Sequence, residues 1–184
     1  MDHRFILRRA VDTDNIALSQ LNQHAFRETF IDGFTIPIGE DNLQSYFRTS
    51  VSPEAHAKKI ADPQQATWII IDKTNNEFVA FTNAGPCTLS HPDVRAGEDA
   101  ELHRIYVRRD RQGYGLGQWL MNVALSWLEE RFPGRPIWVT VWSGNSKAQK
   151  LFKNYNFNKV DNYSYKLGEY NAENIIMRRE SFSS

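Results

Sequence analysis

Three glycines lie within five residues, at Gly113, Gly115 and Gly117, between a predicted strand and a predicted helix. The first turn of a helix carries unpaired N–H groups and a partial positive charge, so it suits a phosphate group. Glycines also allow a ligand to approach the backbone closely. The segment therefore predicts a phosphate-binding turn, and a tight turn that needs glycine only for its own geometry is the alternative. Near this turn in the sequence there is a single acidic residue, Asp110, and there are four arginines: Arg104, Arg108, Arg109 and Arg111.

The spacing of the glycines narrows the type of phosphate ligand. The Gly-Lys-Ser/Thr end of a Walker loop is absent. A dinucleotide-binding turn has Gly-x-Gly-x-x-Gly in an early strand–helix–strand unit, whereas these glycines have a different spacing and come late in the chain. The parts of a protein kinase are also missing. None of these three phosphate-binding patterns therefore describes the turn.

Two side chains just before this turn could transfer protons. Glu101 and His103 stand two residues apart on the predicted strand AELHRIYV, residues 100–107. Because side chains alternate along a strand, we expect both to share a face with Ile105 and Val107. A solvated carboxylate and a packed core histidine are the plainer interpretations.

The surrounding sequence predicts the elements that position these groups. Runs rich in β-branched and aromatic residues predict strands at FILRRA, TWIIID, EFVAFTNAG, AELHRIYV, PIWVTVW, NKVDNYSYKLG and ENIIMRRE. Apolar residues at helical spacing predict helices from a cap at Asp12 or Thr13 towards Phe30, around 42–48, from Ser52-Pro53, from Leu116 to PGRP, and over 145–155. The order predicts an α+β (α/β layered) fold on a mostly antiparallel sheet.

Length and composition fit one folded domain. The chain has 184 residues, with 22 Lys+Arg against 22 Asp+Glu. This balance argues against binding to nucleic acid or to an anionic membrane surface. One cysteine, no signal-peptide core and no membrane-spanning run predict a cytoplasmic protein, or also a nuclear one in a eukaryote. We expect one domain over 1–180 and a flexible tail over 181–184.

The glycine turn and a later segment together resemble the GCN5-related N-acetyltransferases. The stretch 112–117, QGYGLG, fits the Gln/Arg-x-x-Gly-x-Gly/Ala pattern of that family, and NSKAQKLFKNYNF is similar to its later Asn-x-x-Ala…Tyr-x-x-x-Gly-Phe segment. The order of elements also agrees. HAFRETFIDGF and YKLGEYNAENIIMRRE further resemble PaiA-type polyamine acetyltransferases. The resemblance implies a sheet of six to seven strands in which the fourth and fifth splay apart.

The resemblance implies that acetyl-CoA binds along this splay. The glycine turn would hold the pyrophosphate, and the Ile105 N–H is a plausible donor to the thioester oxygen. Asn145 would contact the pantetheine arm, although its plainer role is a helix cap. No metal is expected. The full set implied for acetyl-CoA is Ile105, Tyr106, Val107, Gln112, Gly113, Tyr114, Gly115, Leu116, Gly117, Asn145, Ala148 and Phe152.

The resemblance also implies catalytic roles, with one departure. Glu101 is the first candidate for the base that deprotonates the amine, and His103 is the second. The family tyrosine that protonates the departing thiolate corresponds to Phe152, which has no proton to give. Tyr155, one turn later, or solvent could replace it. The family glycine before the final Phe corresponds to Asn156, which tolerates the left-handed conformation.

The acceptor implied by the resemblance is a small primary amine, with a polyamine favoured. Glu28, Phe30 and Tyr46 are the predicted acceptor residues, and Asp32, Glu40 and Asp41 could add to an acidic lining. A protein or peptide, an amino acid or a xenobiotic amine is the alternative acceptor. An acyl-CoA-binding regulatory module without catalysis is a further alternative, motivated by Phe152. A homodimer is possible by analogy with the family.

Overall fold

The computed structural model describes residues 3–181, so the predicted tail beyond Ser181 lies outside the described residues. Its centre is one seven-stranded sheet in the order β1-β2-β3-β4-β5-β7-β6. Neighbouring strands are antiparallel except β4 and β5, which are parallel. The strands are β1 Phe5–Arg9, β2 Ala66–Asp72, β3 Glu77–Pro86, β4 Ala100–Val107, β5 Ile137–Trp142, β6 Asn158–Leu167 and β7 Tyr170–Arg179.

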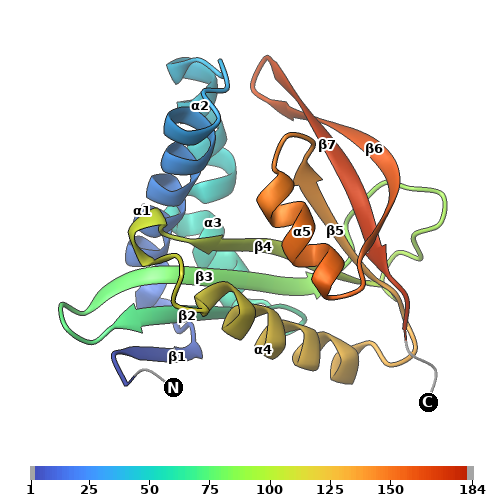
Figure 1. The fold of residues 1–184 in the computed structure, drawn as a ribbon, viewed down its shortest axis with the longest axis horizontal. Helices are drawn as coiled ribbons and strands as arrows, with labels where there is room; N and C mark the ends of the chain where they lie inside the picture. Colours follow the sequence, from blue (N-terminus) through green and yellow to red (C-terminus); the bar gives the residue numbers. More distant parts are fainter. Residues whose placement is uncertain (1–2, 182–184) are drawn as a thin grey trace.

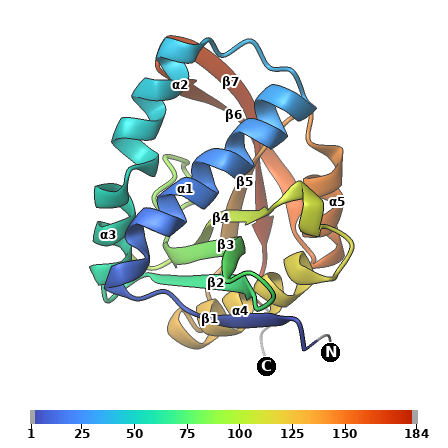
Figure 2. The same ribbon diagram turned by 90° about the vertical axis from the view of Figure 1, so that its left-hand side faces the viewer.

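Helices cover both faces of the sheet (Figures 1 and 2). One face packs against α4, whose apolar residues Leu120, Ala124 and Leu128 are fully buried. The other face packs against α1 and α3. The helices are α1 Asn15–Phe26, α2 Glu40–Tyr46, α3 Pro53–Ala61, α4 Leu116–Arg131 and α5 Ser146–Asn154. Short turns of other helix types are η1 Asp12–Asp14, η2 Arg27–Gly33, η3 Phe47–Val51 and η4 Arg109–Arg111.

The predicted splay between β4 and β5 is present. The two strands pair only at their start, where Ala100 lies opposite Ile137 and Glu101 opposite Trp138. Beyond Glu101 the strands diverge, as Figure 1 shows, and the pairing edge of β4 towards β5 is left without a partner strand. An unpaired strand edge presents backbone donors and acceptors to a ligand.

A β-bulge interrupts β4 at His103. Leu102 pairs with Ala84 and Arg104 pairs with Asn83, so His103 has no partner on β3. Leu102, Ile105 and Val107 all pack in the core cluster that α4 completes, and Glu101, the neighbour of Leu102 before the bulge, lies on the opposite face. The expectation that Glu101 shares a face with Ile105 and Val107 is therefore wrong, because the extra residue of a bulge reverses the alternation after it.

Most predicted elements are present with small shifts in their ends. α3 begins at Pro53 as expected, and Ser52 caps it, since its Oγ accepts the Ala55 N–H at 3.1 Å. The cap of α1 at Asp12 or Thr13 is wrong: η1 comes first, and Asp14 precedes α1. The Asp14 carboxylate accepts the Val11 N–H at 2.8 Å and pairs with Arg8. Residues 3–181 contain no helix long and apolar enough to cross a membrane.

Candidate active site

The glycine turn joins η4 to α4 through left-handed backbone. Gly113 has φ +87° and Gly115, which precedes α4, has φ +76°. Only glycine adopts these angles without cost. Gly117 differs, because it lies in the helix and a Cβ there would meet only ordinary contacts at 3.9 Å or more. Packing within the chain therefore does not require glycine at 117, and the open space beside it is available to a ligand.

A cavity of about 680 Å³ lies over this turn and along the free edge of β4. We call it the donor cavity. Eleven of the twelve residues implied for acetyl-CoA line it: Ile105, Tyr106, Val107, Gln112, Gly113, Gly115, Leu116, Gly117, Asn145, Ala148 and Phe152. The twelfth, Tyr114, points elsewhere and packs edge-on against Phe5 with ring centroids 5.3 Å apart. Asn145 also caps α5, since its Oδ1 accepts the Ala148 N–H at 3.1 Å.

The arginines near the turn have separate partners. Arg108 pairs with Glu77 and Asp110, and Arg111 pairs with Asp72 and Asp110. Arg109 lines the donor cavity, whereas Arg104 does not. Sequence proximity therefore overestimated the number of arginines available to a phosphate group.

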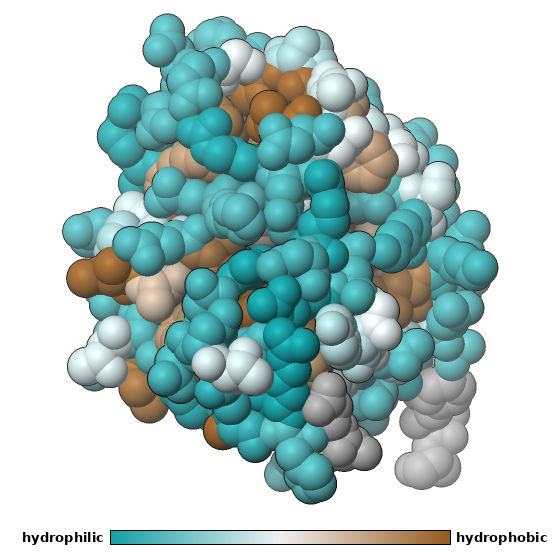
Figure 3. Space-filling model, turned by 60° about the vertical axis from the view of Figure 1, so that its left-hand side comes forward, coloured by the Kyte–Doolittle hydropathy of each residue, from teal (hydrophilic) through white to brown (hydrophobic). Residues whose placement is uncertain are grey.

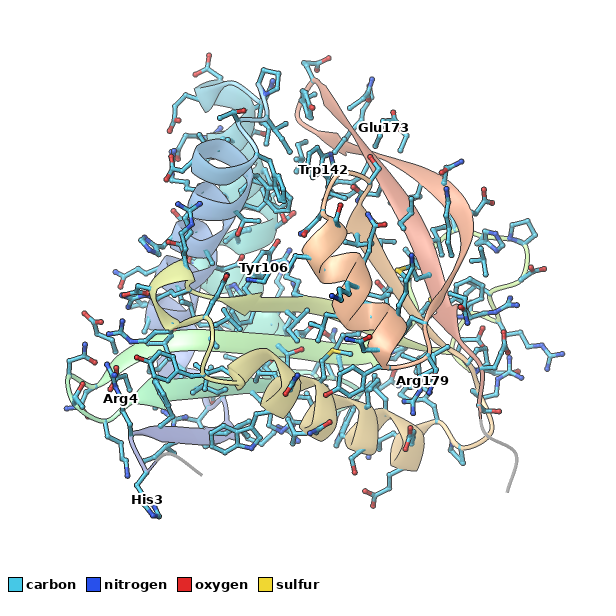
Figure 4. The ribbon with its side chains drawn as sticks, in the orientation of Figure 1. His3, Arg4, Tyr106, Trp142, Glu173 and Arg179 are labelled. Atoms are coloured by element: carbon cyan, nitrogen blue, oxygen red, sulfur yellow. The ribbon has the colours of Figure 1, made fainter. Side chains whose placement is uncertain are left out.

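A second cavity of about 470 Å³ lies between the α1–α3 side of the molecule and the β5–β7 side. We call it the acceptor cavity. Its lining is rich in aromatic side chains, including Phe26, Phe30, Tyr46, Trp142, Tyr165 and Tyr170. Figure 4 shows Tyr106 and Trp142 on the facing sides of the space between these two halves. The two cavities share five lining residues: Ile105, Tyr106, Asn145, Ala148 and Phe152.

Glu101 and His103 form a pair in the wall of the acceptor cavity. The ring Nδ1 of His103 lies 3.2 Å from Glu101 Oε2. The other carboxylate oxygen, Oε1, accepts the N–H of Thr88 at 2.8 Å and its hydroxyl at 3.2 Å. Burial alone raises the pKa of Glu101, but the His103 ring and the Thr88 donors outweigh it, so the net pKa lies below its ordinary value. Glu101 is therefore ionised, and its oxygens already have donors.

The same pair fixes the tautomer of His103. A carboxylate oxygen only accepts, so Nδ1 carries the proton and Nε2 of the neutral ring holds a lone pair. Among the residues that the structure describes, Nε2 is buried and has no hydrogen-bond partner. Because His103 lines the acceptor cavity, its ring is the candidate proton acceptor for a molecule bound there.

The structure does not bring Tyr155 to either cavity. Its hydroxyl donates to Asn122 Oδ1 at 3.0 Å, on α4. Phe152, by contrast, is 3% exposed and lines both cavities. Asn156 has φ +69°, so the expected left-handed conformation at this position is confirmed.

The predicted acidic lining is not found in the acceptor cavity. Glu28 lines the donor cavity instead, where its carboxylate accepts the Arg109 N–H at 2.7 Å and lies 3.2 Å from the His24 ring. Glu40 pairs with Arg27 at the surface. Asp32 and Asp41 are exposed and line neither cavity. Of the predicted acceptor residues, Phe30 and Tyr46 do line the acceptor cavity.

Two cationic residues in the acceptor cavity were not predicted, Lys59 and Arg104. Arg104 was assigned to the phosphate turn because it is close to it in sequence. Its position directly after His103 on the predicted strand could have indicated a place near the acceptor cavity. The bulge at His103 decides which way the following side chains point, however, and the sequence does not show it. Lys59 lies on α3, far from β4 in sequence, and nothing in the local pattern marks it.

The donor cavity fits acetyl-CoA. It combines a helix start with left-handed glycines, an unpaired strand edge and a glycine whose missing side chain leaves open space. Among residues 3–181 there is no cluster of three or more His, Cys, Asp or Glu side chains that could hold a metal ion.

Comparison with known proteins agrees with this geometry. Residues 23–157 match the model of the Acetyltransferase (GNAT) family, which is more than half of the chain. The chain therefore belongs to the GNAT family. It is an N-acetyltransferase that uses acetyl-CoA as the acetyl donor.

Individual relatives are distant. An "Uncharacterized N-acetyltransferase in pepI 3'region" of Lactobacillus delbrueckii subsp. lactis is 22% identical over 158 residues, covering 83% of this chain and 86% of the relative. The PaiA N-acetyltransferase of Thermoplasma acidophilum, solved with coenzyme A, has a TM-score of 0.72 at 16% identity, covering 96% and 98% of the two chains. The ribosomal-protein-S18-alanine N-acetyltransferase of Escherichia coli has a TM-score of 0.65 at 21% identity, covering 98% and 96%.

Proposed function

We propose that the protein transfers an acetyl group directly from acetyl-CoA to the primary amine of a small acceptor, with His103 as the base. The observation that carries this proposal is the meeting of the two cavities. They share a five-residue wall, and His103, whose Nε2 has no hydrogen-bond partner among the described residues, lines the acceptor cavity but not the donor cavity. A direct transfer requires donor and acceptor to reach one point, and this arrangement holds them there.

The donor is held by the residues of the donor cavity. The N–H groups at the start of α4 bind the pyrophosphate, and the free edge of β4 binds the pantetheine arm as a neighbouring strand would. When bound, acetyl-CoA supplies an acyl group already activated as a thioester. Lys147, whose Nζ donates to Gln112 Oε1 at 2.6 Å, adds a positive charge beside the turn.

His103 and Glu101 divide the work of deprotonating the amine. An ammonium group must lose a proton before its nitrogen can attack, and His103 Nε2 takes that proton. Glu101 holds the ring through Nδ1 and stabilises the positive charge that the ring acquires. The roles therefore differ from the first expectation: Glu101 positions the ring, and His103 is the catalytic residue.

The departing thiolate needs no strong acid. A free thiol has a pKa of about 8.5, so the thiolate is a stable leaving group near neutral pH. Phe152 cannot donate a proton, and Tyr155 is bound to α4. Within the shared wall, Tyr106 carries a hydroxyl, and burial raises its pKa, so it stays protonated. Because a raised pKa makes Tyr106 the weaker acid, we assign solvent as the first candidate for the proton donor and Tyr106, which can hydrogen-bond to the thiolate, as the second.

The polyamine specificity suggested by resemblance gains no support from the acceptor cavity. A polyamine carries several positive charges, which require carboxylates in the site. Glu28, Glu40, Asp32 and Asp41 line other surfaces or other cavities. Glu101 is the acidic residue in the lining, and its oxygens already accept from Thr88 and His103.

The test is release of coenzyme A thiol from acetyl-CoA in the presence of an amine panel. The panel contains amino acids, polyamines, aromatic amines, lysine peptides and alanine-terminated peptides. Release that depends on one class of small amine supports the proposal. Tight acetyl-CoA binding without release on any amine would instead favour a regulatory module that binds acyl-CoA.

A further inference from the structure

Arg104 is a half-buried arginine that forms no ion pair with any residue that the structure describes. One terminal nitrogen, Nη2, donates to the Ser50 carbonyl at 3.0 Å. The other, Nη1, is buried and has no hydrogen-bond partner among the described residues. A buried guanidinium N–H without an acceptor is costly, so this group is suited to an acceptor atom supplied by a ligand.

Lys59 adds a second positive charge to the same wall. It lines the acceptor cavity with Arg104 and has no carboxylate within ion-pair distance among the residues described. Burial, and then the charge of Arg104, lowers the pKa of Lys59 to about 7, although the charge of Glu101 acts in the opposite direction. Burial, and then the charges of Arg104 and Lys59, lower the pKa of the neighbouring His56 to about 3. His56 is therefore neutral at pH 7 and adds no charge to this wall. An anion bound here would favour the charged form of Lys59.

The positive character continues beyond the acceptor cavity. Arg104 and Lys59 also line an adjacent cavity of about 440 Å³. Arg48 and Lys58 add two more cations there, and Glu54 is the acidic residue among its described lining. Closely placed charges of one sign raise the local concentration of the opposite sign. The wall between the two cavities is therefore a place where a negative group of the acceptor is stabilised.

We propose that the acceptor is a small amine that also carries a carboxylate, and that Arg104, with Lys59, binds this carboxylate while the amine lies at His103. The inference rests on the proposed function and specifies its acceptor class. His103 and Arg104 are adjacent on β4 and both line the acceptor cavity, so the imidazole ring and the guanidinium group are available to one ligand. Arginine favours carboxylate because its planar donors match the two oxygens.

Besides the amine and the carboxylate, the acceptor has a side chain, and the remaining lining of the cavity indicates its type. Phe26, Phe30, Trp142 and Tyr165 give the cavity an aromatic surface, and its volume of about 470 Å³ suits a small molecule. The chemistry that satisfies all three features is an amino acid with an aromatic or large aliphatic side chain. A polycation has no negative group for Arg104 and Lys59 to bind.

The experiment compares matched amines that differ only in the carboxylate. Phenylalanine is paired with phenethylamine, tryptophan with tryptamine, and leucine with isoamylamine; spermidine is added separately. We expect kcat/KM to be about 10- to 100-fold higher for the carboxylated member of the preferred pair, the range for a hydrogen bond to a charged group. In Arg104→Gln this ratio should fall to near one, and in Lys59→Gln it should fall partly. Arg95→Gln, an exposed arginine that lines none of the three cavities, is the charge-matched control and should keep the wild-type ratio.

The outcomes separate the two proposals. Acetyl transfer that is equal for both members of each pair, or best for spermidine, overturns the carboxylate inference and leaves the proposed function standing. No transfer to any amine overturns the proposed function. In that case calorimetric binding of the paired amines to the complex with coenzyme A still decides the inference, since only binding that requires both the carboxylate and Arg104 supports it. If Arg104→Gln does not fold, Arg104→Lys and Lys59→Gln supply the same comparison.

Discussion

The donor and acceptor cavities lie side by side but are built in opposite ways. The donor cavity depends on backbone: two left-handed glycines, the start of α4 and an unpaired strand edge. Most of it comes from β4, the turn after it and α5. The acceptor cavity depends on side chains that come from α1, α2, α3, β4, β5 and the β6–β7 pair. A backbone site binds a ligand common to a whole family, whereas a side-chain site can change its specificity by substitution alone.

The two cavities meet at a cluster of aromatic side chains. Figure 3 shows a face that is mostly hydrophilic, with hydrophobic residues gathered near its top. Phe34 contacts Trp142 with ring centroids 4.7 Å apart, and Phe30 contacts both. Phe34 lines the donor cavity, while Phe30 and Trp142 line the acceptor cavity. These three rings therefore join the two halves of the molecule at the boundary between the sites.

The largest expected effect is on the donor side. Gly115→Glu should weaken acetyl-CoA binding by about 100-fold or more, because it fills the left-handed turn and places a negative charge beside the pyrophosphate. Calorimetric titration with acetyl-CoA measures this loss. Gly134→Glu is a matched control, since Gly134 has φ +73° and similar open space but lies outside both cavities. Equal affinities for the two variants would refute the assignment of the turn.

The next effect is on the acceptor side and concerns rate. His103→Gln keeps a hydrogen-bond donor for Glu101 but removes the basic nitrogen. We expect kcat to fall by about 10²- to 10⁴-fold, with acetyl-CoA affinity unchanged. Steady-state kinetics together with calorimetry measure the two quantities separately.

Glu101→Gln distinguishes the two members of the pair. Because we assign it a positioning role, its kcat should fall less than that of His103→Gln, with KM for the amine little changed. A larger fall in Glu101→Gln than in His103→Gln would return Glu101 to the role of base.

A smaller effect is expected at the boundary of the cavities. Phe152→Tyr places a hydroxyl where both cavities meet, and we expect kcat to rise by about tenfold or less, because the thiolate is already a good leaving group. The comparison is run in wild type and in Tyr106→Phe. If the gain is larger in Tyr106→Phe, Tyr106 is the native proton donor; no gain in either background means that another step limits the rate.

The last prediction concerns stability and tests the charge on Lys59. Its pKa is about 7 in the folded chain and about 10.4 in an unfolded one. Between these pH values the unfolded chain binds more protons, so the free energy of unfolding should rise with pH. Urea unfolding at pH 7, 8 and 9 should show this rise in wild type and a weaker one in Lys59→Gln. The exposed neighbour Lys58→Gln should behave as wild type; parallel curves for all three would place Lys59 in solvent.

The sequence alone determined the parts of the protein that depend on neighbours in the chain. The order of strands and helices, the start of α3 after Ser52, the left-handed Asn156 and the glycine turn follow from local periodicity and from the few residues that tolerate positive φ. Two matched segments were then enough to indicate the family and its donor.

Only the tertiary structure decided the acceptor side. The bulge at His103 changes which face each later residue of β4 occupies, and no local pattern marks it. It separates Glu101 from Ile105 and Val107. The folding of α3 over the sheet places Lys59 beside Arg104, while Glu28 turns to the donor cavity and Tyr155 to α4. The physical reason is that side-chain direction and charge pairing depend on contacts between residues far apart in sequence, which periodicity does not encode.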